Sequence, residues 1–380
     1  MELQDYRKQL DELDAELLGL FNRRMDIAGD IALWKRDNGM RVLDLRREKE
    51  KLRTLEAQCP EEMREYASSL FSLIMELSRS YQTRILRPES AETRAIEKAL
   101  QDTPQLFPET ATVACQGVEG AYSGIACEKL FKRPSTFYFS SFDAVFAAIE
   151  KGLCRYGVIP VENSTAGTVN AVYDLMRRHD FRIVRSVRVK VDHNLLVRPG
   201  TKLGDIREIY SHPQAIAQCA AFLQTLPKVK VIPCENTALA AKMAAESTEP
   251  GIAALSSRAC SRLYGLDILK SDVQDSGNNY TRFICISRSL EIYPGADRTS
   301  VMMVLPHEPG SLYKLLSRFN ALGINVTKLE SRPMPERSFE FMFYFDFETS
   351  VYSPRFIQLM GELGELTDEY EYLGSYSEVI

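Results

Sequence analysis

Residues 3–37 read LQDYRKQLDELDAELLGLFNRRMDIAGDIALWKRD and contain no proline, so no residue in this stretch forces a helix to end. Large apolar side chains recur in it at spacings of three and four residues, from Leu13 and Leu17 to Ile31 and Trp34. This period places them along one face of an amphipathic helix roughly 50 Å long. We therefore expect one long helix from about residue 3 to residue 37.

The first hundred residues as a whole are poor in helix breakers. They hold 2 of the 17 prolines and 3 of the 20 glycines. Asn38-Gly39 and Cys59-Pro60 separate the long helix from two further helices, expected over about 44–57 and 61–86. Three helices of this length cannot form a compact monomeric core, so we expect an all-α domain over 1–88 that forms an intertwined homodimer or a higher homo-oligomer.

Short apolar runs alternate with amphipathic patterns after a polar linker over 89–110. Strands are expected near 112–114, 156–159, 208–210, 229–232, 252–254 and 283–286, with helices near 144–151, 171–178, 216–226 and 238–246. This alternation predicts an α/β domain of mostly parallel strands over 111–288. Its length favours two lobes around a ligand-binding cleft, as in periplasmic-binding-protein-like folds.

The order of patterns changes once more in the last eighty residues. From about residue 299 we expect strand, helix, strand, strand, helix and strand, over 300–305, 311–322, 325–330, 340–347, 354–363 and 370–376. This order is typical of an α+β ferredoxin-like unit, here over 299–378. The chain is therefore expected to be multidomain.

Composition excludes several classes of partner and site. The 380 residues include 47 basic and 52 acidic side chains, a net charge of -5, which argues against a general nucleic-acid or membrane-surface binder. No stretch resembles a signal peptide or a transmembrane span, so a cytoplasmic protein is expected. The eight cysteines include no Cys-x-x-Cys pair, and the four histidines show no metal-ligand spacing. We therefore expect no disulfide framework and no metal site.

Charged side chains recur at helical spacing in the first domain. Arg24 and Lys35 are eleven residues apart and so return to nearly the same helix face. Arg7 lies seventeen residues before Arg24, about 25 Å away on another face, and could reach only the site of a partner subunit. The later helices add Asp44, Arg47, Glu48, Ser78 and Gln82. Such a group suits a compact dianion with a hydroxyl, although spacing alone does not distinguish it from solvated charges.

Residues 1–88 resemble the helical chorismate mutases, through the positions just given and the run Leu3…Leu13-Asp14…Leu17-Leu18…Val42…Glu76. The resemblance implies that Arg24, Arg47 and Arg7 of the partner subunit bind the two carboxylates of chorismate. It implies that Lys35 and Gln82 donate to the ether oxygen. Glu48 and the backbone near Asp44 would hold the hydroxyl, and Ser78 would line the pocket. A Claisen rearrangement needs a folded conformer and donors at the breaking C–O bond, but no nucleophile.

Polar clusters lie at the ends of three expected strands of the middle domain, at 161–167, 210–214 and 278–283. Each of them alone could be turn chemistry or a helix cap. A fourth, 117–123, has only part of a phosphate-loop pattern. In this order they resemble prephenate dehydratase over about 111–288, most specifically at Thr281-Arg282-Phe283. The resemblance implies that Thr281 helps the ring hydroxyl leave as carbon dioxide departs. It assigns further catalytic polar positions to Asn163, Ser211 and Gln214, with Glu162 and His212 as additional candidates.

Two motifs of the last domain resemble the ACT regulatory domain of phenylalanine-sensing dehydratases. One is Glu308-Pro309-Gly310-Ser311-Leu312 at a helix start, and the other is Glu330-Ser331-Arg332-Pro333 at a strand end. The resemblance implies that residues 309–312 and 330–333 line an allosteric site for L-phenylalanine. Backbone donors at the helix start would bind its carboxylate.

The combined prediction is a bifunctional enzyme of phenylalanine biosynthesis that needs no cofactor. It would convert chorismate to prephenate and prephenate to phenylpyruvate, with feedback regulation by L-phenylalanine. Two alternatives for the middle domain stay open: an arogenate dehydratase, whose substrate carries an added amino group, and a non-catalytic ligand sensor.

Overall fold

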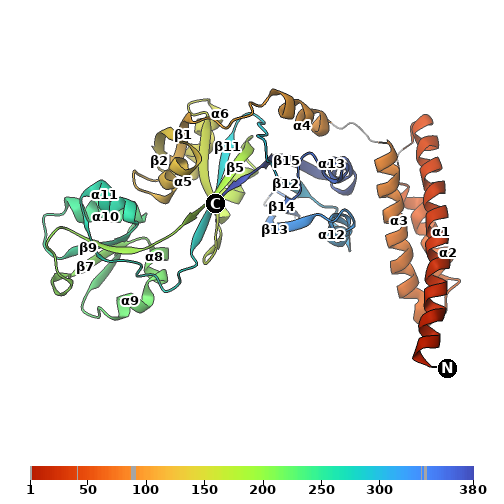
Figure 1. Ribbon diagram of the computed structural model, residues 1–380, viewed down its shortest axis with the longest axis horizontal. Coiled ribbons are helices and arrows are strands. Elements are labelled where there is room, and N and C mark those ends of the chain that lie inside the picture. The colour runs from red at the N-terminus through yellow and green to blue at the C-terminus, as the bar shows by residue number, and fades with distance from the viewer. Residues whose placement is uncertain (1, 41, 87–90, 335, 338–339) are drawn as a thin grey trace. The chain divides into compact units, whose positions relative to one another are not determined.

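The computed structural model describes residues 2–40, 42–86, 91–334, 336–337 and 340–380 (Figure 1). The chain forms two compact units. The first comprises Met1–Arg94, Met303–Asn325 and Tyr352–Tyr370, and the second comprises Ala95–Met302, Val326–Val351 and Glu371–Ile380. No helix among the described residues is long and apolar enough to cross a membrane.

The helices of the first domain confirm the predicted pattern. They are α1 (Leu3–Asp37), α2 (Leu45–Glu56), a 3-10 turn η1 (Glu61–Met63) and α3 (Arg64–Leu86). The Asp44 carboxylate caps α2 by accepting from the Arg47 backbone N–H at 3.0 Å. On α1, Ala28, Gly29 and Ala32 are buried, and small side chains there let α3 approach closely. The first unit also holds α12 (Ser311–Ala321) and α13 (Pro354–Leu366).

One face of α1 carries large apolar side chains that remain exposed in a single chain. They are Leu3, Tyr6, Leu10, Leu13, Leu17, Leu20, Ile27, Ile31 and Trp34, while the exposed Leu18 and Leu33 lie on other sides of the helix. An apolar stripe of this length is typical of a surface that another protein chain covers.

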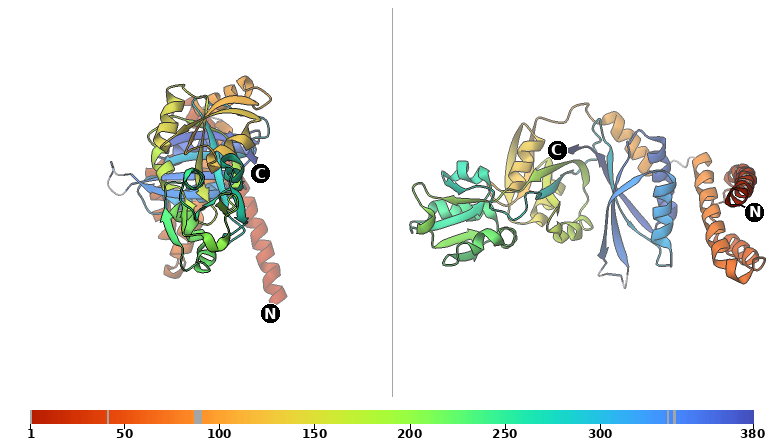
Figure 2. Two further views of the ribbon diagram at one scale, coloured as in Figure 1. Left: turned by 90° about the vertical axis from the view of Figure 1, so that its left-hand side faces the viewer. Right: turned by 60° about the horizontal axis from the view of Figure 1, so that its bottom comes forward.

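Two sheets lie wholly within the second unit, and Figures 1 and 2 show them as separate lobes. The first sheet has the order β16-β5-β11-β3-β1-β2, with β4 beside β3. Its strands are β1 (Thr110–Gln116), β2 (Arg133–Phe139), β3 (Tyr156–Asn163), β4 (Gly167–Thr168), β5 (Arg182–Lys190), β11 (Tyr280–Ser287) and β16 (Glu378–Val379). Its helices are α5 (Tyr122–Leu130), α6 (Phe142–Glu150) and α7 (Asn170–Met176).

The second sheet has the order β10-β6-β9-β7-β8. Its strands are β6 (Asn194–Val197), β7 (Glu208–Ser211), β8 (Lys230–Pro233), β9 (Ile252–Ser256) and β10 (Asp267–Lys270). It carries η2 (Leu203–Asp205), α8 (Pro213–Gln218), α9 (Ala220–Gln224), α10 (Thr237–Glu246) and α11 (Arg258–Tyr264).

The prediction of mostly parallel strands is wrong. Strand β11 runs antiparallel to both β3 and β5, and β6 runs antiparallel to β9 and β10. The reason is topological, because the chain passes from the first lobe to the second after β5 and returns through β11. The expected linker over 89–110 also contains a helix, α4 (Ala91–Asp102), while residues 89–90 lie outside the described part.

The C-terminal elements follow the predicted order. They are β12 (Arg298–Val304), α12, β13 (Asn325–Pro333), β14 (Phe341–Glu348), α13 and β15 (Glu369–Tyr376). The four strands form a sheet in the order β13-β14-β12-β15, which is the ferredoxin-like arrangement. We call it the C-terminal sheet. The chain then returns to the first sheet, where β16 pairs with β5, and this pairing was not predicted.

Candidate active sites

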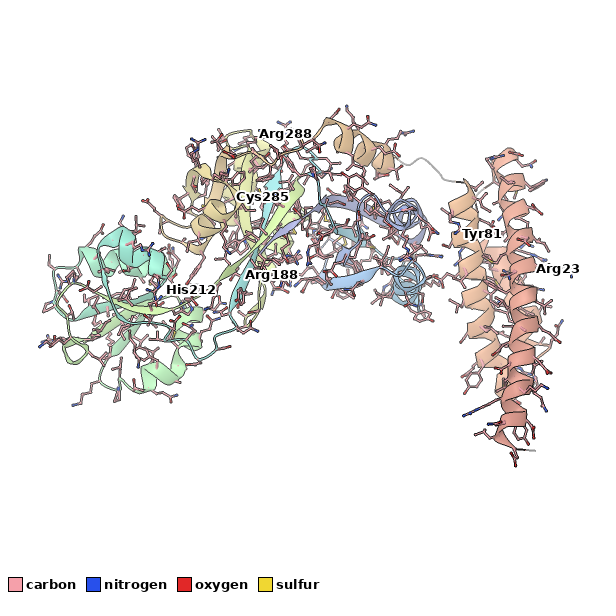
Figure 3. The ribbon with its side chains drawn as sticks, in the orientation of Figure 1. Arg23, Tyr81, Arg188, His212, Cys285 and Arg288 are labelled. Carbon is pink, nitrogen blue, oxygen red and sulfur yellow. The ribbon has the colours of Figure 1, made fainter. Side chains whose placement is uncertain are left out.

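The structure brings Arg24 of α1 and Ser78 of α3 together, as the helical pattern predicted. The Arg24 guanidinium donates to the Ser78 hydroxyl, and it also lies 3.4 Å from the carbonyl of Ile74. Burial lowers the pKa of Arg24, and the Glu48 carboxylate opposes that shift. Figure 3 shows α1 and α3 side by side, with Arg23 and Tyr81 labelled. A partly buried guanidinium between two helices is suited to bind a carboxylate.

Other predicted residues of the helical site have partners on neighbouring elements. Lys35 Nζ donates to the Val42 carbonyl at 2.6 Å. Glu48 of α2 accepts from Arg79 of α3 at 2.5 Å. Gln82 is buried, and no hydrogen-bond partner for its Oε1 atom is found among the described residues. Sequence reasoning missed Arg79, although it lies three residues before Gln82 and so on the same side of α3.

Arg7 and Arg47 are exposed in a single chain. Arg7 is on α1, about 25 Å along the helix from Arg24. The structure therefore does not bring Arg7 to the group around Arg24 within one chain.

Asn163 and Thr281 form the centre of the second candidate site. They are partners in the antiparallel pairing of β3 with β11, and Asn163 Nδ2 donates to Thr281 Oγ1 at 3.0 Å. The same amide donates to Asn279 Oδ1 at 2.7 Å and to the Tyr280 carbonyl at 3.2 Å. Because Thr281 Oγ1 accepts from Asn163, the Thr281 hydroxyl hydrogen can donate to another group. Thr281 is partly exposed, so a ligand can reach it.

The second lobe reaches this pair through Gln218 at the end of α8. Gln218 Nε2 donates to Thr165 Oγ1 at 2.8 Å, while its Oε1 accepts from Asn279 Nδ2 at 2.9 Å. The His193 ring Nε2 lies 2.9 Å from the same oxygen, and burial lowers the pKa of His193, which favours the neutral ring. Sequence reasoning missed both residues. Gln218 lies one helical turn after Gln214, which was the available signal.

Residues of the cluster at 210–214 lie partly in the protein core and partly on the surface. Ser211 is fully buried and donates to the Leu255 carbonyl at 2.8 Å, so it fixes β7 to β9 instead of joining the group around Thr281. His212, labelled in Figure 3, caps α8, since its Nδ1 accepts from the Gln214 backbone N–H at 3.2 Å. Burial lowers the pKa of His212. The Gln214 side chain is exposed at the first turn of α8.

Glu162 lies next to Asn163 but has a different set of partners. It accepts from Arg282 and from Lys328 of β13, both at 2.9 Å. Burial acts to raise the pKa of Glu162, but the pairing with Lys328 and Arg282 outweighs burial and lowers this pKa. Neighbouring strand residues face opposite sides of a sheet, so Glu162 is directed away from the Thr281 hydroxyl.

The two motifs predicted to bind an effector have different environments. Gly310 caps α12 with a left-handed φ of 87°, and the Ser311 hydroxyl donates to the Glu308 carbonyl at 3.1 Å. Glu330 accepts from Thr168 at 2.7 Å, beside the Asn163 loop. Arg332 binds Asp174 of α7 through two bonds of 2.9 Å. Glu330 and Arg332 therefore contact the dehydratase-like segment directly. No cluster of three or more metal-ligating side chains is found within the described ranges.

Two known protein families match the segments of the chain that contain the two candidate sites. Residues 6–83 match the family Chorismate mutase type II, and residues 113–291 match Prephenate dehydratase. The bifunctional chorismate mutase/prephenate dehydratase of Escherichia coli (strain K12) is 31% identical over 381 residues, covering 97% of this chain and 95% of the relative.

Two further relatives each match 70% of the chain. Arogenate dehydratase 2 of Petunia hybrida is 38% identical over 281 residues, covering 70% of this chain and 71% of its own. A solved structure, prephenate dehydratase from Arthrobacter aurescens in complex with L-Phe, has a TM-score of 0.65 and 28% identity, and the match covers 70% of this chain and 89% of that one. With both domains matched and nearly the whole length covered, the chain belongs to the family of bifunctional chorismate mutase/prephenate dehydratases.

Proposed function

We propose that the helical domain of this enzyme rearranges chorismate to prephenate and that the two-lobed domain converts prephenate to phenylpyruvate, carbon dioxide and water. Family membership over nearly the full chain supports both activities. The observation that carries the second assignment is the Asn163–Thr281 pair, since the Thr281 oxygen accepts from Asn163 and its hydroxyl hydrogen can donate to a ligand at this partly exposed position.

Thr281 acts on the leaving hydroxyl in this proposal. As the C–C bond to the carboxylate breaks, its electron pair completes the aromatic ring and the C–O bond to the hydroxyl breaks. Thr281 donates a hydrogen bond to the departing oxygen, on which negative charge develops, and the hydroxide that leaves takes up a proton from solvent to form water. The bond from Asn163 Nδ2 orients Thr281 Oγ1 and polarises its O–H. Gln218 and Gln214 supply amide groups from the second lobe.

The helical site needs only binding and orientation. Arg24, Arg47 and Arg7 of the partner subunit would bind the two carboxylates of chorismate. Lys35 and Gln82 would donate to the ether oxygen. Lys35 keeps two ammonium hydrogens beyond its bond to Val42, which supports this role. Glu48, the backbone near Asp44 and Ser78 complete the predicted site.

A homodimer, or a larger oligomer built from it, completes the mutase in this proposal. The exposed apolar stripe of α1 provides a surface that a second α1 can cover. Because Arg7 lies far from Arg24 on one helix, only a partner subunit can bring an Arg7 to the site.

We further propose that domains at 1–88, 111–288 and 299–378 divide the work and that the last is an ACT domain responding to L-phenylalanine. The ferredoxin-like strand order and the L-Phe complex of the Arthrobacter relative support this. The helix start at Pro309–Leu312 offers backbone donors for a carboxylate. Glu330 and Arg332, with Ser331 and Pro333, would act where β13 touches α7 and β4.

Product analysis of the purified full chain tests the proposal. Chorismate should yield prephenate, and prephenate should yield phenylpyruvate. Thr281→Ala should abolish phenylpyruvate formation and spare the mutase. Lys35→Ala should abolish most mutase activity at unchanged helicity and spare the dehydratase. If the wild-type protein forms no phenylpyruvate, the middle domain is a ligand sensor and this proposal is wrong.

A second candidate substrate is arogenate, since the Petunia hybrida relative is an arogenate dehydratase. Its added amino group is a cation that a neutral amide cluster does not repel. The ratio of kcat/KM for the two substrates decides between them.

A further inference from the structure

The ionic pair Arg282–Glu162 lies directly beside the Thr281–Asn163 pair. Both pairs are partners in the register of β11 with β3, one residue apart. Successive side chains of a strand alternate between faces. One residue step along β11 therefore leads from the Thr281 hydroxyl to a charged group on the opposite face of the sheet.

That opposite face meets the C-terminal sheet. Arg282 Nη2 lies 2.5 Å from Asp346 Oδ2 of β14 and 3.1 Å from the Tyr376 hydroxyl of β15. Arg282 Nη1 donates to Glu162 at 2.9 Å. The Ser300 hydroxyl of β12 donates to the other Asp346 oxygen and lies 2.7 Å from the Tyr376 hydroxyl. The guanidinium thus links β11 to three strands of the C-terminal sheet through direct and shared partners.

The backbone at this point has an irregular ladder. The register shifts between Arg282 and Phe283: Arg282 pairs with Glu162 and Phe283 pairs with Pro160. One residue of β3 therefore has no partner on β11, as in a β-bulge. Bulges bend a strand and redirect its side chains, and they recur next to active sites. The Thr281–Asn163 pair lies next to this register shift, so the direction of the Thr281 side chain depends on how firmly Arg282 is held.

Arg282 is firmly held because its side chain is only 9% exposed and is surrounded by acids. Although burial opposes it, Tyr376, Asp346 and Glu162 raise the pKa of Arg282, so it is a cation in the folded chain. A buried cation cannot leave its partners without a large desolvation cost, and a planar guanidinium fixes direction as well as position.

We infer that Arg282 is a positioning residue for dehydration: by anchoring β11 to the C-terminal sheet through Asp346, it fixes the Thr281 hydroxyl against Asn163. The inference rests on the proposed function of Thr281. It makes a residue of the C-terminal sheet, Asp346, part of the support of the dehydratase site, although Asp346 lies on the opposite face from the hydroxyl.

The test compares Arg282→Met, Arg282→Lys and Asp346→Asn in the full chain. Since misplacement by about 1 Å can cost about a hundredfold in rate, Arg282→Met should lower the dehydratase kcat by about tenfold to a hundredfold with a much smaller change in KM. Arg282→Lys should restore part of kcat because it keeps the charge, and Asp346→Asn should give an intermediate loss. Circular dichroism and cooperative thermal unfolding of the full chain report whether each variant is folded.

Arg182→Met is the matched control. Arg182 of β5 pairs with Glu371 of β15 at 3.1 Å, so it also joins the first sheet to the C-terminal sheet, but its partner on β11 is Ser287, far from Thr281. Hydrogen exchange of the peptide 278–287 gives a readout independent of activity, and it should rise in Arg282→Met and not in Arg182→Met. A wild-type kcat in folded Arg282→Met and Asp346→Asn, or equal losses in Arg182→Met, would overturn the inference. Failure of the proposed function is separate, since then the wild-type chain would itself lack dehydratase activity.

Discussion

A buried cluster of charges joins α3 to α12 and α13 within the first unit, and it can be tested by removing its cation. Arg318 Nε lies 2.8 Å from Glu362 Oε2, and Arg318 Nη2 donates to the Glu76 carbonyl at 3.0 Å. Ser80 Oγ and Gln358 Nε2 donate to Glu362 Oε1 at 2.7 and 2.8 Å. Arg318→Met keeps an apolar stem and leaves the Glu362 carboxylate without its cation.

The size of the effect follows from burial, because the Arg318 and Glu362 side chains are only 3% and 4% exposed. Removing one partner of such a pair costs about 3–5 kcal/mol. Arg318→Met with Glu362→Gln should recover most of that loss, since Gln keeps the Oε1 acceptor without the charge.

Urea unfolding followed by the fluorescence of Trp34 measures the effect, because Trp34 is the single tryptophan of the chain and lies on α1. With an m-value of about 2 kcal/mol/M, the midpoint should fall by about 1.5–2.5 M. Arg46→Met is the control, since Arg46 and Glu50 form a helix pair that is 91% and 50% exposed and contributes about 0.5 kcal/mol at most. If Arg318→Met shifts the midpoint no more than Arg46→Met does, the reasoning from burial is wrong.

Three further predictions concern other parts of the molecule. Although burial opposes the shift, ion pairing lowers the pKa of Glu162. The ionised carboxylate therefore stabilises the folded chain fully above about pH 4.3, and this stabilisation is lost as the pH falls through the folded-state pKa. The difference in unfolding free energy between wild type and Glu162→Gln should accordingly vanish in acid. Gly374→Ala should destabilise the second unit by about 3 kcal/mol or more in thermal unfolding, because a Cβ there would lie 2.2 Å from the Ile183 carbonyl oxygen. A thiol reagent should label Cys59 and Cys234 in the native chain and all eight cysteines after denaturation, since the other six are buried; labelling of more than these two in the native chain would contradict the fold.

The sequence predicted those parts of the fold that local patterns determine. The spacing from Leu13 to Trp34 and the absence of proline gave the extent of α1, and Asn38-Gly39 gave its end. The order of elements after residue 298 was predicted for the same reason. The direction of the strands was not predicted. The antiparallel pairing of β11 with β3 depends on how the chain crosses between the two lobes, and no local sequence pattern indicates that crossing.

The sequence predicted candidate site residues only where a recognisable motif contains them. Thr281 and Asn163 belong to separate motifs, and the structure places them in one hydrogen bond. Ser211 shared a motif with Gln214 but is buried in the core of the second sheet, since strand alternation turns it inward. The pairing of Arg282 with Asp346 joins residues 64 positions apart, and neither sequence neighbourhood indicates it.

Strand β16 has a consequence for how the enzyme is made. Its two residues pair with β5, 192 positions earlier in the chain, and Glu378 lies 2.9 Å from Arg188, labelled in Figure 3. While the chain is being synthesised, this part of the β5 edge therefore stays open until residues 378–379 have left the ribosome. An open edge can pair with strands of other chains, so this period carries a risk of aggregation. Completion of the first sheet thus follows the synthesis of all four strands of the C-terminal sheet, well after the mutase helices can assemble.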